Sequence, residues 1–116
     1  AGKSTFARAF IHTLGFKGSV KSPTYSLLEA YGLDDGFEAV HMDLYRLADP
    51  EEVDYLALDE YEKNALAILI EWPEKGVGHI PPADIAIHFT TQAEGRLLKI
   101  APFTLEAKHW VLAINT

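Results

Sequence analysis

Two largely apolar segments, each of which ends directly at an acidic residue, constrain the fold of this chain most strongly. Residues 37–42 lead into Asp43, and the aliphatic run 65–70 leads into Glu71. Short segments with a continuous apolar character are typical of interior parallel strands, because both of their faces are covered. The two segments therefore predict strands inside an α/β sheet, with an acid at the end of each.

Helical and extended patterns surround these strands. Residues 4–14 predict a helix that ends at Gly15, with apolar positions three and four residues apart. The face expected to be buried consists of Phe6, Ala9, Phe10, Thr13 and Leu14. Residues 24–31 predict an extended segment, since β-branched and aromatic residues occur there without a helix cap before them.

The second half of the chain continues the alternation. Asp49-Pro50-Glu51-Glu52 predicts a helix start, with an N-cap carboxylate, proline in the first turn and acids near the positive end of the dipole. Residues 85–89 and 97–100 predict a hairpin joined through Glu94-Gly95, and residues 104–112 a short helix. Together these patterns predict an α/β layered domain with an antiparallel extension.

Length and composition limit the class of protein. With 116 residues, 48% hydrophobic and 23% charged, the chain is expected to be one globular domain spanning residues 1–116. The absence of cysteine excludes disulfides and thiolate zinc sites. The longest aliphatic run is far shorter than the ~20 residues that span a bilayer, and no signal-peptide pattern is visible. We expect a cytoplasmic protein without membrane association.

Charge is distributed unevenly along the chain. The net charge of −7 argues against a protein that grips nucleic acid alone, because affinity for a polyanion needs clustered Lys and Arg. The charged residues of positions 1–28 are all basic, whereas acids dominate positions 29–74. This asymmetry suits an anionic ligand near the start and carboxylates nearby for a cation, or it is a chance feature of a solvated surface.

A phosphate-binding pattern opens the chain. Ala1-Gly2-Lys3-Ser4-Thr5 precedes the first expected helix and matches the second half of the P-loop pattern G-x-x-x-x-G-K-[ST]. Glycine lets backbone N–H groups approach phosphate oxygens, Lys3 would place its charge on the β and γ phosphates, and the Ser4 hydroxyl would ligate Mg²⁺. The alternative is a solvated helix N-terminus.

The two strand-end acids complete this pattern. A P-loop site needs carboxylates at the ends of neighbouring strands to hold Mg²⁺ and orient water. An acid directly after a buried strand needs a partner, and a metal is the natural one. Either Asp43 or Glu71 alone could be a solvated strand end or a helix cap, but the two together with Gly-Lys-Ser favour a nucleotide site. The histidines show no metal-ligand spacing: His12, His41, His79, His88 and His109.

Three longer motifs identify a family. Ser22-Pro23-Thr24-Tyr25-Ser26-Leu27, the block from His41 to Glu52 (HMDLYRLADPEE) and Ile70-Glu71-Trp72-Pro73 follow in this order. The chain resembles the TsaE (YjeE) family from Ala1 through the hairpin, and the stretch after Pro102 matches no motif. The resemblance implies a P-loop NTPase-like three-layer domain with a mainly parallel sheet. It also implies an ATPase that uses ATP and Mg²⁺ and supports the TsaD–TsaB pair, which modifies the adenosine beside the anticodon in tRNA.

The resemblance assigns roles at matching positions. Lys3 resembles the phosphate-binding lysine, Asp43 the Walker B acid and Glu71 a second acid that reaches Mg²⁺ or its water. Thr5 would lie near the α-phosphate, Thr24 would sense the γ-phosphate, and the Trp72 ring would pack beside the nucleotide. Tyr45 and Arg46 belong to the motif, with an aromatic wedge and an ion pair as structural alternatives. The expected sites are catalytic Asp43, Glu71 and Thr24; nucleotide-binding Gly2, Lys3, Ser4, Thr5 and Trp72; and metal-binding Ser4, Asp43 and Glu71.

The resemblance also implies an earlier segment. A strand and the first P-loop glycine are expected before Ala1, so the domain is expected to be incomplete at its N-terminus. Two other functions stay open: a nucleotide-gated binding module without catalysis, and a P-loop kinase for a small molecule. A GTP switch is disfavoured, because neither D-x-x-G after Asp43 nor N-K-x-D occurs in the sequence.

Overall fold

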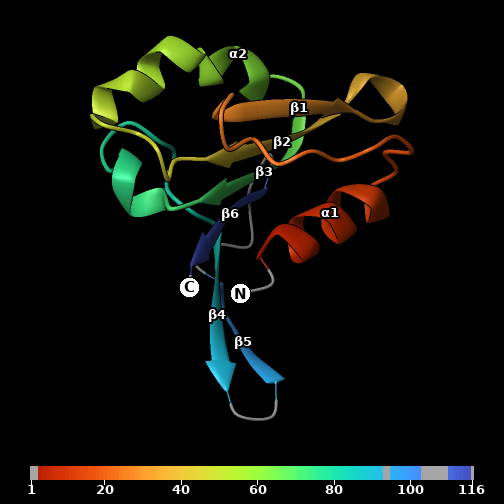
Figure 1. The fold of residues 1–116 in the computed structure, drawn as a ribbon. Coiled ribbons are helices and arrows are strands. Elements are labelled where there is room, and N and C mark those ends of the chain that lie inside the picture. Colours follow the sequence, from red (N-terminus) through yellow and green to blue (C-terminus); the bar gives the residue numbers. More distant parts are fainter. Residues whose placement is uncertain (1–2, 93–94, 103–109, 116) are drawn as a thin grey trace.

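A six-stranded sheet forms the centre of the computed structural model, which describes residues 3–92, 95–102 and 110–115. The strands lie in the order β1-β2-β3-β6-β4-β5 (Figure 1). The pairs β2–β3, β3–β6 and β6–β4 are parallel, whereas β1 runs antiparallel to β2 and β5 antiparallel to β4. The strands are β1 (Leu28–Gly32), β2 (Glu38–Asp43), β3 (Ala65–Glu71), β4 (Ile85–Gln92), β5 (Gly95–Pro102) and β6 (Trp110–Asn115).

Helices cover both faces of the sheet. Helix α1 (Lys3–Thr13) lies on one face, and the short helices η2 (Pro50–Leu56) and α2 (Leu58–Glu62) lie on the other (Figure 1). Two further 3₁₀ turns, η1 (Asp34–Gly36) and η3 (Pro73–Gly76), occur in connections. The predicted three-layer α/β architecture, with a mainly parallel sheet and the β4–β5 hairpin as an antiparallel extension, is confirmed.

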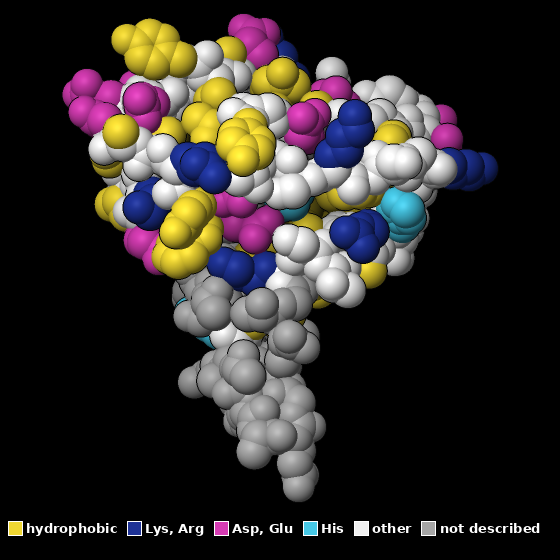
Figure 2. Space-filling model, in the orientation of Figure 1, with side chains coloured by type: hydrophobic (Ala, Val, Ile, Leu, Met, Phe, Trp, Pro, Cys, Tyr) yellow, Lys and Arg dark blue, Asp and Glu magenta, His cyan; other side chains and the backbone are white. Residues whose placement is uncertain are grey.

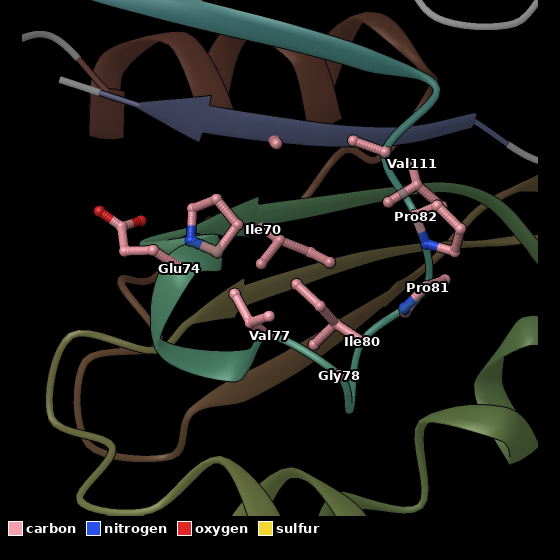
Figure 3. A pocket seen from close by; sticks show the side chains of 11 residues that line it. Ile70, Glu74, Val77, Gly78, Ile80, Pro81, Pro82 and Val111 are labelled. Carbon is pink, nitrogen blue, oxygen red and sulfur yellow. The ribbon is translucent and has the colours of Figure 1, made fainter.

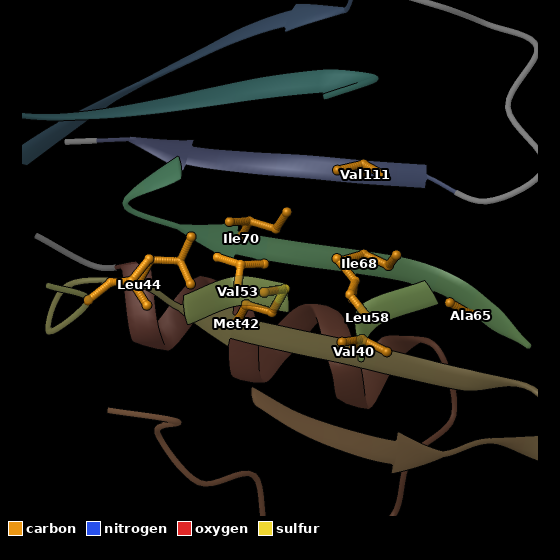
Figure 4. Close-up of a cluster of buried hydrophobic side chains, with 10 residues drawn as sticks. Val40, Met42, Leu44, Val53, Leu58, Ala65, Ile68, Ile70 and Val111 are labelled. Atoms are coloured by element: carbon orange, nitrogen blue, oxygen red, sulfur yellow. The ribbon is translucent and has the colours of Figure 1, made fainter. Parts of the chain in front are cut away.

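Strand β3 separates two apolar clusters. Ile68 and Ile70 point toward η2 and α2, where they pack with Val40, Met42, Leu44, Val53 and Leu58 (Figure 4). Ala67 and Leu69 point to the other face and pack with Ala7 of α1. Burial on both faces explains the continuous apolar run, as expected for an interior parallel strand. Leu66 is the exception and is 39% exposed. It lies where the β2–β3 register shifts between Glu38 and Ala39.

Helix α1 forms as predicted, but its buried face is rotated. Ala7 and Ile11 are fully buried, whereas Ala9 and Thr13 are exposed. The predicted buried face was therefore wrong at Ala9 and Thr13. The reason is that Ala7 and Ile11, four residues apart, face the sheet, and the apolar stripe centres on them. Thr13 instead donates its hydroxyl to the Ala9 carbonyl at 2.8 Å. Gly15, with φ of 118°, follows the helix.

The segment expected to be extended over residues 24–31 is a strand only from Leu28. Residues 24–26 form a turn, and Leu27 has φ of 68°. The Leu27 N–H donates to the Pro23 carbonyl at 2.8 Å, which closes the turn. A local backbone hydrogen bond therefore overrides the β propensity of Thr24 and Tyr25.

The C-terminal prediction was wrong in kind. The helix expected over residues 104–112 conflicts with strand β6, which begins at Trp110; residues 103–109 lie outside the described part. Strand β6 pairs on both sides, with β3 and β4, so its type follows from tertiary pairing. The predicted hairpin is confirmed, although Glu94 of its connection also lies outside the described residues. The strand expected before Ala1 stays a prediction.

The predicted helix start at Asp49 is confirmed, although the helix is 3₁₀ rather than α. The Asp49 carboxylate accepts from the Glu51 N–H at 2.9 Å, and Glu52 completes a capping box by accepting from the Asp49 N–H at 3.3 Å. Within the described ranges, we find no helix of the length and apolarity needed to cross a membrane.

Candidate functional site

The carboxyl ends of β2 and β3 bring the two predicted acids together. Asp43 and Glu71 are directly paired in the parallel register, and their residues are only 9% and 5% exposed. Met42 and Ile70 point to the η2 face. Because side chains alternate along a strand, Asp43 and Glu71 both lie on the α1 side of the sheet.

Each carboxylate has one oxygen held by the protein. The Oδ1 atom of Asp43 accepts from the Tyr45 N–H at 3.0 Å. The Oε2 atom of Glu71 lies 2.6 Å from Nε2 of His41, a buried side chain two residues before Asp43 on the same strand. The acids are therefore oriented from the backbone in one case and from a neighbouring side chain in the other.

Lys3 contacts Trp72, the residue that directly follows Glu71. Its Nζ is 4.5 Å from the centroid of the Trp72 ring, a cation–π geometry. Trp72 follows Glu71 directly and has φ of 58°, in the left-handed region that non-glycine residues rarely adopt. The Tyr45 ring lies 5.0 Å from the Trp72 ring, centroid to centroid. An ammonium and two aromatic rings thus border the strand ends that carry the acids.

The first turn of α1 carries features that suit an anion. Lys3 opens the helix, Ser4 and Thr5 are exposed, and the first turn has no acidic residue. The unpaired N–H groups and the dipole of a helix N-terminus favour negative charge. Gly2 lies outside the described residues.

Thr24 sits in a loop that other motif residues connect to the acids. Its Oγ1 is 2.6 Å from the Ser22 Oγ, so its observed contact is within the loop. The Leu27 carbonyl accepts from the Asp43 N–H at 3.1 Å, which ties the loop end to the end of β2. The Arg46 guanidinium lies over the Tyr25 ring at 4.7 Å, a cation–π geometry, and the ion pair considered as its structural role stays a prediction. The structure therefore brings two motifs together, without giving Thr24 a direct contact to Asp43 or Glu71.

The carboxylates fit a magnesium ion that is shared with a nucleotide. Mg²⁺ is usually held by one or two carboxylates together with substrate phosphates and waters, not by an all-protein cage. Asp43 and Glu71 supply two carboxylates on adjacent strands, and the Ser4 hydroxyl lies on α1. Among the residues that the structure describes, no group of three or more His, Asp or Glu could hold a metal by itself. This donor set fits a cation that arrives with phosphate.

An apolar pocket lies on the other side of the sheet. It has a volume of about 280 Å³ and is lined by Ile70, Val77, Ile80, Pro82 and Val111, with Glu74 at its margin (Figure 3). Ile70 points into it from the face opposite Glu71. A lining with so few polar groups offers nothing to hold phosphates, so we do not place the nucleotide there.

Sequence reasoning missed the role of one residue. His41 was expected only as part of the motif strand, yet its ring contacts Glu71. The sequence did contain one signal: side chains alternate along a strand, so His41 and Asp43, two residues apart, lie on the same face of β2. Its contact with Glu71 depends on the β2–β3 register and was not readable from the sequence.

A three-layer domain with a parallel sheet, a Gly-Lys-Ser helix start and acids at neighbouring strand ends defines the class of P-loop NTPases. The family model described as threonylcarbamoyl adenosine biosynthesis protein TsaE matches residues 1–98. The chain belongs to the TsaE family.

Individual relatives agree. The chain is 39% identical over 115 residues to the tRNA threonylcarbamoyladenosine biosynthesis protein TsaE of Haemophilus influenzae, covering 99% of this chain and 72% of that relative. The Bacillus subtilis protein of the same name is 40% identical over 72 residues, which cover 62% of this chain and 44% of that relative. The Treponema pallidum protein is 30% identical over 95 residues, or 82% of this chain and 69% of that relative.

Family membership fixes the general activity. TsaE proteins are P-loop ATPases of threonylcarbamoyladenosine biosynthesis on tRNA, so the chain is an ATP-binding domain of that pathway. The predicted family and the predicted P-loop fold are thereby confirmed.

Proposed function

We propose that the chain hydrolyses Mg²⁺-bound ATP in support of threonylcarbamoyl transfer to the adenosine beside the anticodon, working with TsaD and TsaB. The observation that carries the proposal is the pair of buried acids, Asp43 and Glu71, in direct register at the ends of adjacent parallel strands. Two carboxylates in this position would repel each other unless a cation or donors lie between them. A nucleotide-bound cation provides that charge.

The proposed chemistry relies on positioning and electrostatics. The Lys3 ammonium would leave the Trp72 ring to neutralise the β and γ phosphates, while the N–H groups of the first turn of α1 donate to phosphate oxygens. Ser4, Asp43 and Glu71 would hold Mg²⁺, which supplies charge neutralisation between the phosphates. Glu71 and Asp43 would also orient the attacking water, and Thr24 would sense the γ-phosphate from the loop that is tied to β2. Thr5 would border the α-phosphate.

Surface charge supports a role through protein partners. Residues 49–62 contain seven acids and neither Lys nor Arg, and acidic side chains crowd the end of the molecule that carries η2 and α2 (Figure 2). Such a surface repels the tRNA backbone. Contact with tRNA would therefore be indirect, through TsaD and TsaB.

The test is Mg²⁺-dependent ATP hydrolysis by the full-length protein, alone and with purified TsaD and TsaB. We expect turnover that rises with the partners and is lost in Lys3→Ala and Glu71→Ala. Nucleotide binding without turnover in every mixture would contradict hydrolysis and indicate a nucleotide-gated binding module. Transfer of phosphate to a small molecule would indicate a kinase instead.

A further inference from the structure

We propose that His41 is a positioning residue, which holds the Glu71 carboxylate in the orientation that a nucleotide-bound divalent cation requires. The inference rests on the proposed function, since it concerns the same site. It goes beyond the family resemblance, which assigned no role at the site to His41.

The contact itself is short and sheltered. Nε2 of His41 lies 2.6 Å from Oε2 of Glu71, and the two side chains are 3% and 6% exposed. They come from neighbouring parallel strands. Glu71 pairs in register with Asp43, and His41 lies two residues before Asp43 on β2. Water therefore competes weakly for this hydrogen bond, and the geometry is fixed by the sheet.

The remaining ring nitrogen indicates why the histidine is there. Nδ1 of His41 is buried and has no hydrogen-bond partner in the part of the chain that the structure describes. An unpaired acceptor nitrogen is tolerated in a buried position better than an unpaired N–H donor. We therefore place the ring hydrogen on Nε2, which donates to the Glu71 carboxylate, and leave Nδ1 as the acceptor. An imidazole with one unsatisfied nitrogen is a poor choice for packing alone, because a leucine of similar size would leave no polar atom unpaired.

The contact fixes one oxygen of a flexible side chain. A glutamate has several rotatable bonds, and ordering it on ligand binding costs conformational entropy. With Oε2 engaged by His41, Glu71 is ordered before the cation arrives, and Oε1 remains for the cation or its water. Asp43 is held in the same manner, through Oδ1 and the Tyr45 N–H. Such outer contacts orient ligating groups in many metal sites.

Three substitutions separate positioning from packing. His41→Leu keeps much of the volume and removes the donor. His41→Gln keeps an N–H₂ donor at about the reach of Nε2, whereas the shorter side chain in His41→Asn keeps polarity without that reach. His79→Leu is the control, because His79 is a partly exposed histidine that contacts a different acid, Asp54, at 3.2 Å.

The readout is the free Mg²⁺ concentration that gives the half-maximal change in tryptophan fluorescence with ATP, measured on full-length protein beside thermal unfolding. We expect His41→Leu and His41→Asn to raise this concentration about tenfold or more, the lower end for residues that orient metal ligands. His41→Gln should restore most of the affinity, and all variants should bind ATP without Mg²⁺ as wild type does. A merely structural role would not separate Gln from Asn in this way.

The outcomes are distinguishable from failure of the proposed function. A folded His41→Leu variant with wild-type Mg²⁺ dependence would overturn the inference, even if Lys3→Ala still abolishes turnover. If His41→Leu does not fold, equal Mg²⁺ dependence in His41→Gln and His41→Asn would overturn it. Should wild type bind nucleotide without hydrolysing it, hydrolysis fails, but the Mg²⁺ measurement still decides the role of His41.

Discussion

Trp72 reports on the site at the scale of a single residue. Its ring carries the Lys3 ammonium at 4.5 Å and contacts Tyr45, so any ligand that draws Lys3 away changes the surroundings of the indole. We expect ATP to change the intrinsic fluorescence of the protein, and Trp72→Phe to remove that change.

Trp110→Phe is the control, since Trp72 and Trp110 are the two tryptophans of the sequence. ATP binding should be followed in parallel by equilibrium dialysis. A full fluorescence response in Trp72→Phe, with ATP bound, would show that the change does not arise from Trp72.

Tyr31 anchors the loop that leads to Thr24. Its hydroxyl donates to the Lys21 carbonyl and accepts from the Lys21 N–H, both at 3.0 Å, and its ring packs against Phe16. We expect Tyr31→Phe to lower the free energy of unfolding by about 1 kcal/mol, because two modest hydrogen bonds are lost while the exposed Lys21 backbone regains water, which offsets part of the loss. Urea unfolding measures it. An unchanged midpoint would mean that the loop is held by other contacts.

The same residue predicts a pH dependence. Burial raises the pKa of Tyr31 above its ordinary value of 10.0; the hydrogen bond with the Lys21 backbone opposes this, and Glu29 adds to it. The folded state therefore holds the phenol proton more tightly than the unfolded state. This stability is fully present below pH 10 and is lost as the pH rises through the pKa of the folded protein. We expect a steeper alkaline loss of stability in wild type than in Tyr31→Phe, and parallel curves would contradict it.

At the scale of elements, the capping box is what starts η2. Asp49 and Glu52 satisfy N–H groups that a helix start leaves free. We expect Asp49→Ala to lower the free energy of unfolding by about 1 kcal/mol, a typical cost for a lost N-cap.

Asp59→Ala serves as control, since Asp59 is an exposed acid in the neighbouring helix α2. Its effect should stay within about 0.5 kcal/mol, as for ordinary surface positions. Chemical denaturation of both variants makes the comparison. Equal losses would indicate that negative charge, and not the cap, stabilises this region.

At the scale of the whole molecule, β3 links the two apolar layers. Ile68 is fully buried under η2 and α2, whereas Leu66, two residues earlier, is left at the register shift and is 39% exposed. We expect Ile68→Ala to cost about 2–5 kcal/mol, from lost apolar transfer and the cavity left behind. Leu66→Ala should cost under about 1 kcal/mol, because the Leu66 side chain is already partly exposed to water and its removal loses less buried apolar area.

Thermal unfolding of Ile68→Ala and Leu66→Ala compares the two losses of stability and so tests which residues of β3 are buried between the two layers. A larger loss for Leu66→Ala would contradict the register of β2 against β3.

Several features of this protein followed from the sequence because their causes are local. The apolar run 65–70 predicts a buried strand because all of its residues except Leu66 are buried, and Asp49-Pro50-Glu51-Glu52 predicts a helix start because its capping contacts lie within four residues. Gly2-Lys3-Ser4 and the acids at 43 and 71 gave the site its residues in the same way, by type and spacing.

Other features were decided only by the tertiary structure, because they depend on which strands pair. Residues 110–112 became strand β6 through pairing with β3 and β4, against a local reading as helix. The side of α1 that is buried depends on where the sheet lies, and the register of β2 against β3 sets His41 on Glu71. The sequence alone thus determined the chemical groups and the family; long-range pairing decided how those groups are held.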